Sequence, residues 1–514
     1  MKKIKNIMLL SLLAVVLSTT SCSDFLNVNT DPNRVTDANI TPDLIFTQAE
    51  NSVGVRQASR FVFMNNWMGY WGRSGTFVVD QMETTYQIDN SFTENNWDQA
   101  YNILFDLYQT KTKAIAAKDS VLAGASIVLS VKLWQETVDQ FGDLPYTQAF
   151  NYAKYPQPVY DKASAIYTDL LAQLDQAVKY LNPVVPSSSF AKTDLIFARG
   201  NDVATAVGKW NRFANTIRLR ILLRQSKNGT KPSSELAKIT ANGGVLAAGE
   251  DVSVNPGYSN ATDKQNPFYA AFGLTPAGAP ATTDNTANNY FIKVIEVSNE
   301  TDPRLDQFYQ TPIAGTDYGA QNGSLTGAVV VGTGFGPGLL GTTADGPKRD
   351  QFIMPAFESL FFLAEAVERG WLAGNPQDAY ESAVKENFRW LNVTTTQTKL
   401  SGTAITDSIS SSYLATVQQA IWTNATSTAA RLNLIALQKY ISLNGIDAVE
   451  AWSDLRRGVL VLPMGYLSNN ATAAKSLPNV LTYPQSEFTT NKSHIPTPVR
   501  NTAAIFTEKL FWQP

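Results

Sequence analysis

Apolar positions recur with a helical period over both ends of the chain. In residues 163–182 the apolar side chains are spaced three and four apart, which places them on one side of a helix. Similar stripes occur at 97–117, 120–140, 207–226, 352–370, 376–391, 411–423 and 430–443. The pattern predicts a mainly α-helical protein whose helices each bury one face.

Residues 355–391 are predicted to form two antiparallel helices joined by a short turn. Gly370 suits the left-handed conformation that ends helices, and Asn375 followed by Pro376 is typical of a helix start. Small residues on both segments allow close packing, as in a tetratricopeptide-type unit. Residues 93–140 indicate a second pair. No strict 34-residue period is present, so such repeats would be divergent.

The middle of the chain, about residues 243–350, lacks sustained periodicity and is rich in Gly, Pro, Asn and Thr. A structureless loop of this length is unusual inside a domain. We therefore predict an irregular lobe of short strands, turns and one or two helices, one of them at 289–297. Such a lobe could form part of a ligand-binding face.

The N-terminal residues have the features of an export signal. Three lysines precede an apolar run at 7–17, which is too short to cross a bilayer because a spanning helix needs about 20 residues. We predict a signal peptide at 1–21, a polar tether at 22–40 and a single domain at 41–514, although the length also allows two or three domains.

Cys22 is the only cysteine, and it follows small residues directly after the apolar run. This position favours cleavage before Cys22 by a lipoprotein peptidase and acylation of its thiol, although Thr19 stands where a lipobox typically has Leu. The alternative is a free or buried cysteine near an ordinary secretory cleavage site. A lone cysteine excludes internal disulfides and sites with several cysteine ligands, and we predict no cofactor or metal.

The balance of charged residues bears on which kinds of partner the protein could bind. The chain has 41 basic and 44 acidic side chains, a formal charge of −3. Loss of the three N-terminal lysines with the signal would leave 38 basic side chains and a charge of −6. With no strong basic run, the sequence argues against nucleic acid as a partner.

Signs of catalysis are weak. His494 is the only histidine and no Gly-x-Ser-x-Gly motif occurs, so a serine triad has little support. Gly332, Gly334 and Gly336 alternate as in some phosphate loops, but Pro337 and the next glycine make a following helix unfavourable. We interpret this segment as a turn-rich loop.

Pairs of carboxylates could serve a glycosidase, which needs two at a suitable separation. Glu94 with Asp98, or Asp139 with Asp143, could share a helix face. Nothing in the sequence distinguishes these acids from solvated or capping groups, so we predict that the protein is not an enzyme.

Several segments along the chain are distinctive in order and composition. They are SCSDFLNVNTDPN (21–33), LWQETVDQFGDLPYTQAF (133–150), KWNRFANTIRLRILLR (209–224), NPF (266–268), DPRL (302–305), FFLAEAVERGW (361–371), LQKYISLNG (437–445), EAWSDLRRG (450–458) and YPQSE (483–487). Together these segments resemble the SusD/RagB-like outer-membrane lipoproteins of Bacteroidetes. The paired charges at 220 and 224, and at 450 and 454, are interpreted as ion pairs of the scaffold.

The resemblance implies a SusD-like fold: one mostly helical body with tetratricopeptide-type pairs and an irregular ligand-facing lobe. It also implies a lipid-anchored protein on the cell surface that acts as the lid of a SusC-like TonB-dependent transporter. Members capture glycans or, in some branches, peptides. The leading hypothesis is glycan capture and delivery, with peptide or glycopeptide capture, an outer-membrane glycoside hydrolase and a purely structural repeat protein as alternatives.

The densest mixture of rings and polar groups suited to sugar binding is at residues 61–90. The candidate ligand-binding residues there are Trp67, Tyr70, Trp71, Arg73, Tyr86 and Asp89, with Tyr290 and Tyr318 of the middle lobe as further candidates. On a helix the first three rings would share one face, so a buried core stripe is the alternative. The binding hypothesis depends on the loss of periodicity after Gly72.

Overall fold

Helices form most of the described chain, which comprises residues 40–74, 81–182, 190–297, 300–311, 313, 315–317, 334–393 and 403–514 of a computed structural model. The long helices are α2 (Pro42–Ser59), α5 (Glu94–Ala116), α6 (Ser120–Phe141), α7 (Ala163–Leu181), α9 (Val203–Arg224), α15 (Ala356–Glu368), α16 (Pro376–Leu391), α17 (Thr403–Thr416), α18 (Thr428–Ser442) and α19 (Ala448–Arg457). The prediction of a mainly α fold is confirmed. Cys22, with the predicted signal and nearly all of the tether, lies outside the described residues, as does Tyr318.

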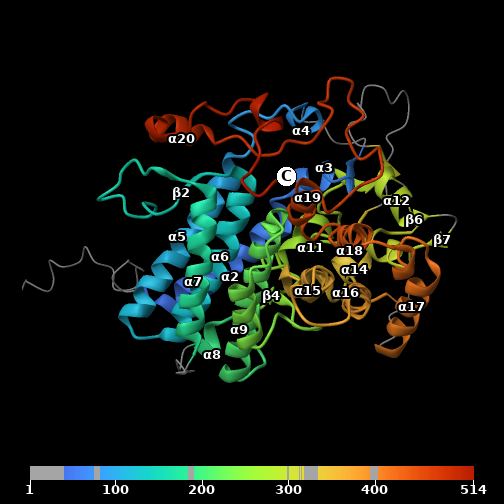
Figure 1. Cartoon of the computed structure of the whole chain (residues 1–514), viewed down its shortest axis with the longest axis horizontal. Helices are drawn as coiled ribbons and strands as arrows, with labels where there is room; N and C mark the ends of the chain where they lie inside the picture. Colours follow the sequence, from blue (N-terminus) through green and yellow to red (C-terminus); the bar gives the residue numbers. More distant parts are fainter. Residues whose placement is uncertain are drawn as a thin grey trace, which may run out of the picture.

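The long helices pack in two groups (Figure 1). Helices α2, α5, α6 and α7 lie side by side, and α15, α16, α17 and α18 form the second group. Helix α9 contacts α6 and α7 on one side and α15 on the other, so it joins the two. The adjacent helices α5 and α6, and α15 and α16, fit the predicted pairs, while their description as tetratricopeptide-type units stays a prediction.

Local capping explains where these helices begin and end. The side chain of Asn375 accepts a hydrogen bond from the backbone N–H of Gln377 at 2.9 Å, and Pro376 is the first residue of α16. Gly370 has φ +68°, in the left-handed region that favours glycine. Asp119 caps α6 in the same way as Asn375 caps α16, by accepting from Leu122 N–H. The boundaries predicted around 370–376 are confirmed.

The apolar stripes did not mark α2 or α19, because both helices bury charged side chains. Helix α2 buries Glu50 and Arg56, and α19 buries Glu450 and Asp454, all at most 1% exposed. Polar residues on the buried face of a helix interrupt its apolar stripe, so the helical period of the apolar residues cannot be recognised in the sequence. The helix predicted at 411–423 is displaced as well, since α17 ends at Thr416 and the chain then turns into a 3₁₀ segment at Trp422–Asn424.

Helix α6 is the core helix of the first group. Among the described residues it is the one helix long and apolar enough to cross a membrane, but 94% of that stretch is buried within the protein. It contacts α5, α7 and α9. Its apolar composition therefore reflects packing against neighbouring helices.

The described residues between 243 and 350, which we call the irregular lobe, form short elements. Its strands are β4 (Val252–Val254), β5 (Asn285–Asn288), β6 (Glu296–Val297), β7 (Glu300–Thr301) and β8 (Gly315–Thr316), and its helices are α11 (Pro267–Phe272), α12 (Asn289–Ile295), α13 (Leu305–Phe308), α14 (Pro337–Leu340) and the 3₁₀ turn Gly346–Lys348. There are more helices than the one or two predicted. Pro337, expected to oppose a helix, opens α14 because proline suits the first helical position.

The lobe is joined to the rest of the chain through two small sheets. Strand β5 lies between β1 (Trp71–Arg73), which it pairs with antiparallel, and β8, which it pairs with in parallel. Trp71 is in register with Ala287. In the second sheet β4 pairs with β9 (Gln351–Met354). The segment predicted to bind ligand is thus tied directly to the lobe.

The remaining described elements are short. They are α3 (Val62–Trp67), α4 (Gln81–Thr85), α8 (Phe190–Thr193), α10 (Ser233–Ala241), α20 (Gln485–Thr490), the paired strands β2 (Leu144–Pro145) and β3 (Tyr160–Asp161), and 3₁₀ turns at Ser226–Asn228, Lys492–His494 and Ala504–Phe506.

A buried ion-pair network crosses the helical scaffold. Arg224 on α9 binds Asp139 of α6 at 3.0 Å (Nε to Oδ2) and donates to Glu450 of α19. Lys439 binds the same glutamate at 3.0 Å and Asp454 at 2.6 Å. The interpretation of these charges as scaffold ion pairs is confirmed.

Candidate functional site

The four rings predicted to bind ligand at 61–90 are buried in the core. Trp67, Tyr70 and Tyr86 are 0% exposed and Trp71 is 1% exposed. Their polar atoms are used internally, since Trp71 Nε1 donates to Asn444 Oδ1 at 3.1 Å and Tyr70 OH donates to the carbonyl of Tyr440 at 2.7 Å. A ring without an exposed face cannot stack on a sugar, so the prediction of ligand contact is wrong for these residues and the core alternative holds.

The backbone explains why these rings turn inward. Helix α3 ends at Trp67, Gly69 has φ +74°, and Trp71 begins β1. A Cβ on Gly69 would lie 2.7 Å from Cδ1 of Tyr290, so that ring packs directly on the turn. Tyr290 is 8% exposed and donates to the carbonyl of Pro463 at 2.9 Å. Tyr290 therefore fixes a loop through its hydroxyl group, and it does not line the cavity of the lobe described below, so the structure does not support its prediction.

Arg73 and Asp89 lie nearer the surface, but both have internal roles. Arg73 Nη2 binds Glu83 Oε2 at 2.6 Å, and its Nη1 donates to Asn285 Oδ1 at 2.7 Å. Asp89 is exposed and accepts hydrogen bonds from the N–H and hydroxyl of Ser91, at 2.8 and 2.7 Å. These bonds lower the pKa of Asp89. Arg73 thus positions Asn285, while Asp89 closes a turn.

A cavity of about 490 Å³ opens in the irregular lobe between α11, the segment before β5, and α14. We call it the lobe cavity. Its apolar wall includes Tyr269, Phe272, Phe335 and Leu340, and its polar wall includes Thr282, Asn285, Gln310, Thr342 and Thr343. None of the described lining residues carries a charge at neutral pH.

The predicted residues form the layer beneath this cavity. The ring of Trp71 lies 4.5 Å from that of Phe335 and 5.2 Å from that of Phe272, centroid to centroid. Arg73 holds Asn285 through Oδ1, which leaves the amide N–H group of Asn285 to donate elsewhere. The residues predicted from the sequence therefore lie next to the lobe cavity. They pack beneath the residues that line it and do not line it themselves.

The lining residues were missed because their signal is faint. Phe335 is a single ring within a Gly-rich stretch, and Phe272 ends a short segment that also contains Phe268 and Tyr269. No sustained period marks either position. An aromatic ring isolated among glycines has few local packing partners, and this feature could have identified Phe335. Asn285 and Gln310 have no comparable mark in the sequence.

The lobe cavity is suited to hydrogen bonding and ring contact. Gln310 is exposed, and its side chain makes no hydrogen bond with the described residues. An amide offers both donors and an acceptor. With uncharged amides and hydroxyls facing apolar rings, the site matches a neutral ligand that has many hydroxyl groups.

The carboxylate pairs considered for catalysis have different environments. Asp139 accepts from Tyr167 OH and binds Arg224, while Asp143 accepts from the N–H of Ala163 at 2.9 Å and binds Lys162. These two acids are structural. Asp98 is an exposed residue whose carboxyl group is partly desolvated. This desolvation and the nearby charges of Glu94 and Glu487 raise the pKa of Asp98.

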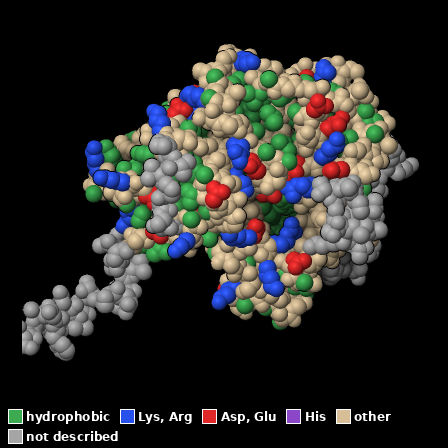
Figure 2. Space-filling model, turned by 90° about the horizontal axis from the view of Figure 1, so that it is seen from below, with side chains coloured by type: hydrophobic (Ala, Val, Ile, Leu, Met, Phe, Trp, Pro, Cys, Tyr) green, Lys and Arg blue, Asp and Glu red, His purple; other side chains and the backbone are tan. Residues whose placement is uncertain are grey.

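Two further features bear on chemistry. His494 is half-buried, and its Nδ1 lies 3.0 Å from Asn491 Oδ1. Within the described ranges, no group of three or more His, Cys, Asp or Glu side chains could hold a metal ion. On the face shown in Figure 2, basic and acidic side chains are interspersed around a hollow, so this face has no continuous basic patch of the kind that binds nucleic acid.

Several solved structures share the fold of this chain. A SusD homolog from Bacteroides fragilis is 19% identical with a TM-score of 0.72, covering 92% of this chain and 99% of that one. A SusD/RagB family protein from Bacteroides thetaiotaomicron is 16% identical with a TM-score of 0.71, covering 92% and 99%. A chitin-binding SusD homolog from Flavobacterium johnsoniae is 21% identical with a TM-score of 0.69, covering 92% and 98%.

The chain belongs to the SusD-like family described as starch-binding and associating with the outer membrane, whose family model matches residues 32–484. The resemblance stated from sequence motifs is thereby confirmed. No curated protein matches the chain. At the identities above, the solved structures establish the fold alone.

Proposed function

We propose that this protein is a lipid-anchored, cell-surface lipoprotein that binds neutral glycan in the lobe cavity and passes it to a SusC-like TonB-dependent transporter. The observation that carries the proposal is the uncharged lining of the lobe cavity, with rings on one wall and amides and hydroxyls on the other. The family description as starch-binding and the chitin-binding relative support a glycan as ligand.

The cavity fits the physical needs of sugar recognition. Its volume of about 490 Å³ lies within the usual range for small-ligand sites, about 300–1,000 Å³. Phe272 and Tyr269 are 8% and 4% exposed, and the part of each ring that lines the cavity offers apolar contact to the C–H groups of a sugar. The hydroxyls of the sugar pair with Asn285 and Gln310. Each sugar hydroxyl donates and accepts, so it is matched by an amide better than by a single charge.

Binding without cleavage is part of the proposal. A glycosidase needs two carboxyl groups flanking the scissile bond, and the described lining of the lobe cavity holds no Asp or Glu. The absence of charged groups also favours glycan over peptide, because peptide ends carry charges that need partners. Anchoring through an acylated Cys22 and the tether at 22–40 would hold the body at the outer membrane beside its transporter.

The proposal is tested with the mature chain and a panel of neutral polysaccharides in affinity electrophoresis, followed by calorimetry with the best oligosaccharide. We expect Gln310→Ala to weaken binding about 10-fold, since a lost hydrogen bond of about 1.5 kcal/mol corresponds to that factor. The matched control is Gln48→Ala on α2, an exposed glutamine remote in sequence from the lobe, which should bind normally.

Three results would contradict the proposal. One is retardation by no glycan together with binding of peptides. Another is the appearance of new reducing ends during incubation with the bound glycan, which would indicate a hydrolase. The third, for the delivery step, is failure of the protein to co-purify with a large barrel protein from native membranes.

A further inference from the structure

A second cavity lies in the helical scaffold, between α5, α6 and α7, and is closed by the segment that follows β2. We call it the helical cavity; its volume is about 250 Å³. We propose that the helical cavity binds a sugar residue that carries a carboxylate, as in a uronic-acid-containing glycan. The inference rests on the proposed function only in taking glycans as the ligand class.

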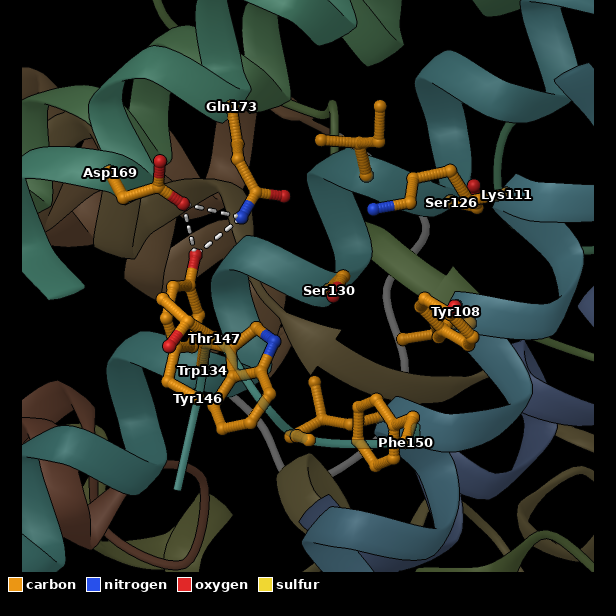
Figure 3. Close-up of a pocket in the computed structure, with 14 residues that line it drawn as sticks. Tyr108, Lys111, Ser126, Ser130, Trp134, Tyr146, Thr147, Phe150, Asp169 and Gln173 are labelled. Carbon is orange, nitrogen blue, oxygen red and sulfur yellow. Dashed lines mark hydrogen bonds between the residues drawn. The ribbon is translucent and has the colours of Figure 1, made fainter. Parts of the chain in front are cut away.

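Aromatic side chains form one wall of the helical cavity. Trp134 of α6 is 5% exposed and packs edge-on against Tyr146, with ring centroids 4.9 Å apart and an interplanar angle of 78°. In Figure 3, Trp134, Tyr146 and Thr147 lie on one side of the cavity and Lys111 and Tyr108 on the other, with Ser130 between them. The accessible part of the indole adds apolar surface to this wall.

Phe150 is held in an unfavourable backbone conformation at the edge of this cavity. Its φ is +68°, in the left-handed region that bulky residues rarely adopt. The ring contacts Tyr108 at 5.6 Å and Trp134 at 6.1 Å between centroids. Such strain persists where surrounding contacts over-determine it, often beside ligand sites. Here it places an aromatic ring where the loop closes the cavity.

Three hydrogen-bond donors of the cavity have no acceptor among the described residues: Lys111 Nζ, Ser130 Oγ and Trp134 Nε1. Lys111 is partly buried, and its ammonium lies 5.7 Å from the ring centroid of Tyr108. Burial lowers the pKa of Lys111, while Asp169 opposes this effect. The indole N–H of Trp134 is accessible from the cavity, so it can donate to a bound molecule. The three unpaired donors therefore favour a ligand that brings several acceptor oxygens.

The acidic group of the cavity is already engaged. Asp169 Oδ2 accepts from Tyr146 OH at 2.6 Å and from Gln173 Nε2 at 3.0 Å. The negative charge is thus shared between two donors on the wall opposite Lys111 (Figure 3). The carbonyl oxygen of Gln173 remains to accept from a hydroxyl group. Asp169 and Gln173 therefore suit the hydroxyls of a sugar, while Lys111 suits an anion.

A carboxylate matches this arrangement best because its two oxygens can accept from the ammonium and from a second donor at once. A neutral sugar would offer the ammonium of Lys111 no charged acceptor of its own, and the one nearby acid, Asp169, is held by Tyr146 and Gln173. A peptide C-terminus has the carboxylate but no ring of hydroxyls for Ser130 and Gln173. The chemistry of the helical cavity therefore differs from that of the uncharged lobe cavity.

The test is calorimetry of the mature chain with trigalacturonate, with galactotriose as the neutral counterpart and a short peptide with a free C-terminus as the third probe. We expect trigalacturonate to bind about 10-fold more tightly than galactotriose, as a charge-assisted hydrogen bond predicts. Lys111→Gln should remove this preference, and Lys111→Arg should retain it. Lys179→Gln, an exposed lysine of α7 outside the cavity, is the matched control and should behave as the wild type.

Trp134→Phe provides a second variant, since it keeps an aromatic ring and removes the N–H. It should weaken trigalacturonate binding while the thermal midpoint shows that the fold is kept. Equal affinity for the acidic and neutral sugars, an unchanged preference in Lys111→Gln, or tighter binding of the peptide would overturn the inference. Gln310→Ala separates the two sites, because it should weaken neutral glycan binding in the lobe and leave the acid preference intact.

Discussion

The rings of Trp71 and Phe335 lie 4.5 Å apart, centroid to centroid, yet only Phe335 lines the lobe cavity. Trp71 comes from β1 and Phe335 from the segment before α14, far along the chain. The contact therefore connects Trp71, which packs beneath the cavity, to Phe335, which lines it. Substitutions at these two positions should therefore separate stability from binding.

We expect Phe335→Leu to weaken neutral glycan binding by about 5-fold, because a lost aromatic contact is worth about 1 kcal/mol. Trp71→Leu should instead lower the free energy of unfolding by about 3 kcal/mol through the space it leaves in the core. Urea unfolding and calorimetry measure the two effects. A Trp71→Leu protein with wild-type stability and no glycan binding would show that the assignment of support and lining is reversed.

Arg304 provides a test of the buried polar network of the lobe. Its side chain is 0% exposed, binds Asp302 at 2.6 Å, and donates to Asn387 at 3.0 Å and Gln438 at 2.8 Å. Arg304→Met would leave these acceptors buried and unpaired, and should reduce the free energy of unfolding by about 3–5 kcal/mol.

The matched control for Arg304 is an exposed ion pair. Arg199 and Asp350 are 2.8 Å apart with side chains 49% and 45% exposed, so Arg199→Met should cost less than about 1 kcal/mol. Denaturant midpoints and slopes compare the two variants. A similar decrease in the free energy of unfolding for both variants would contradict the expectation that the buried Arg304 network stabilises the fold more than an exposed ion pair does.

We expect protonation of Glu136 on α6 to contribute to the loss of protein stability at low pH. Burial alone would raise its pKa, but Lys132 at 2.8 Å and Arg56 at 3.1 Å lower the pKa to about 2. Because this value is below that of the unfolded chain, the carboxylate stabilises the fold fully above about pH 5. The stabilisation, about 3 kcal/mol by linkage, is lost as the pH falls from 5 towards 2.

Glu136→Gln should flatten this part of the stability curve. The variant will be less stable at neutral pH, since Arg56 and Lys132 lose their partner, but its free energy of unfolding should fall less steeply between pH 5 and pH 2. Urea unfolding at a series of pH values measures the difference. A slope equal to that of the wild type would assign the acid sensitivity to other carboxylates.

Lipidation at Cys22 is tested by metabolic labelling with palmitate. Cys22→Ala should lose the label and move the protein from the membrane fraction to the soluble fraction, because an acylated N-terminus is the proposed anchor. Ser23→Ala keeps the thiol and should remain labelled. Labelled Cys22→Ala protein would rule out this residue as the acceptor.

The long amphipathic helices could be predicted because their apolar stripes are local properties of the sequence. Helix α19 has no clear apolar stripe because its buried face includes Glu450 and Asp454, whose partner Lys439 comes from another helix and is not part of the local pattern. The ring assignments failed for a related reason. Trp71 is buried because Phe272 and Phe335 pack against its ring. These two rings come from distant segments of the chain, so the spacing of residues 61–90 cannot predict this burial.

The pairing of β5 with both β1 and β8 has a consequence for engineering this scaffold. A lobe exchanged between relatives at residues 243–350 alone would arrive without the strand at Trp71–Arg73 that it pairs with and without the Arg73 side chain that holds Asn285. The transplantable unit is therefore two separate stretches of chain, and chimaeras with altered ligand preference should exchange residues 61–90 and the lobe together.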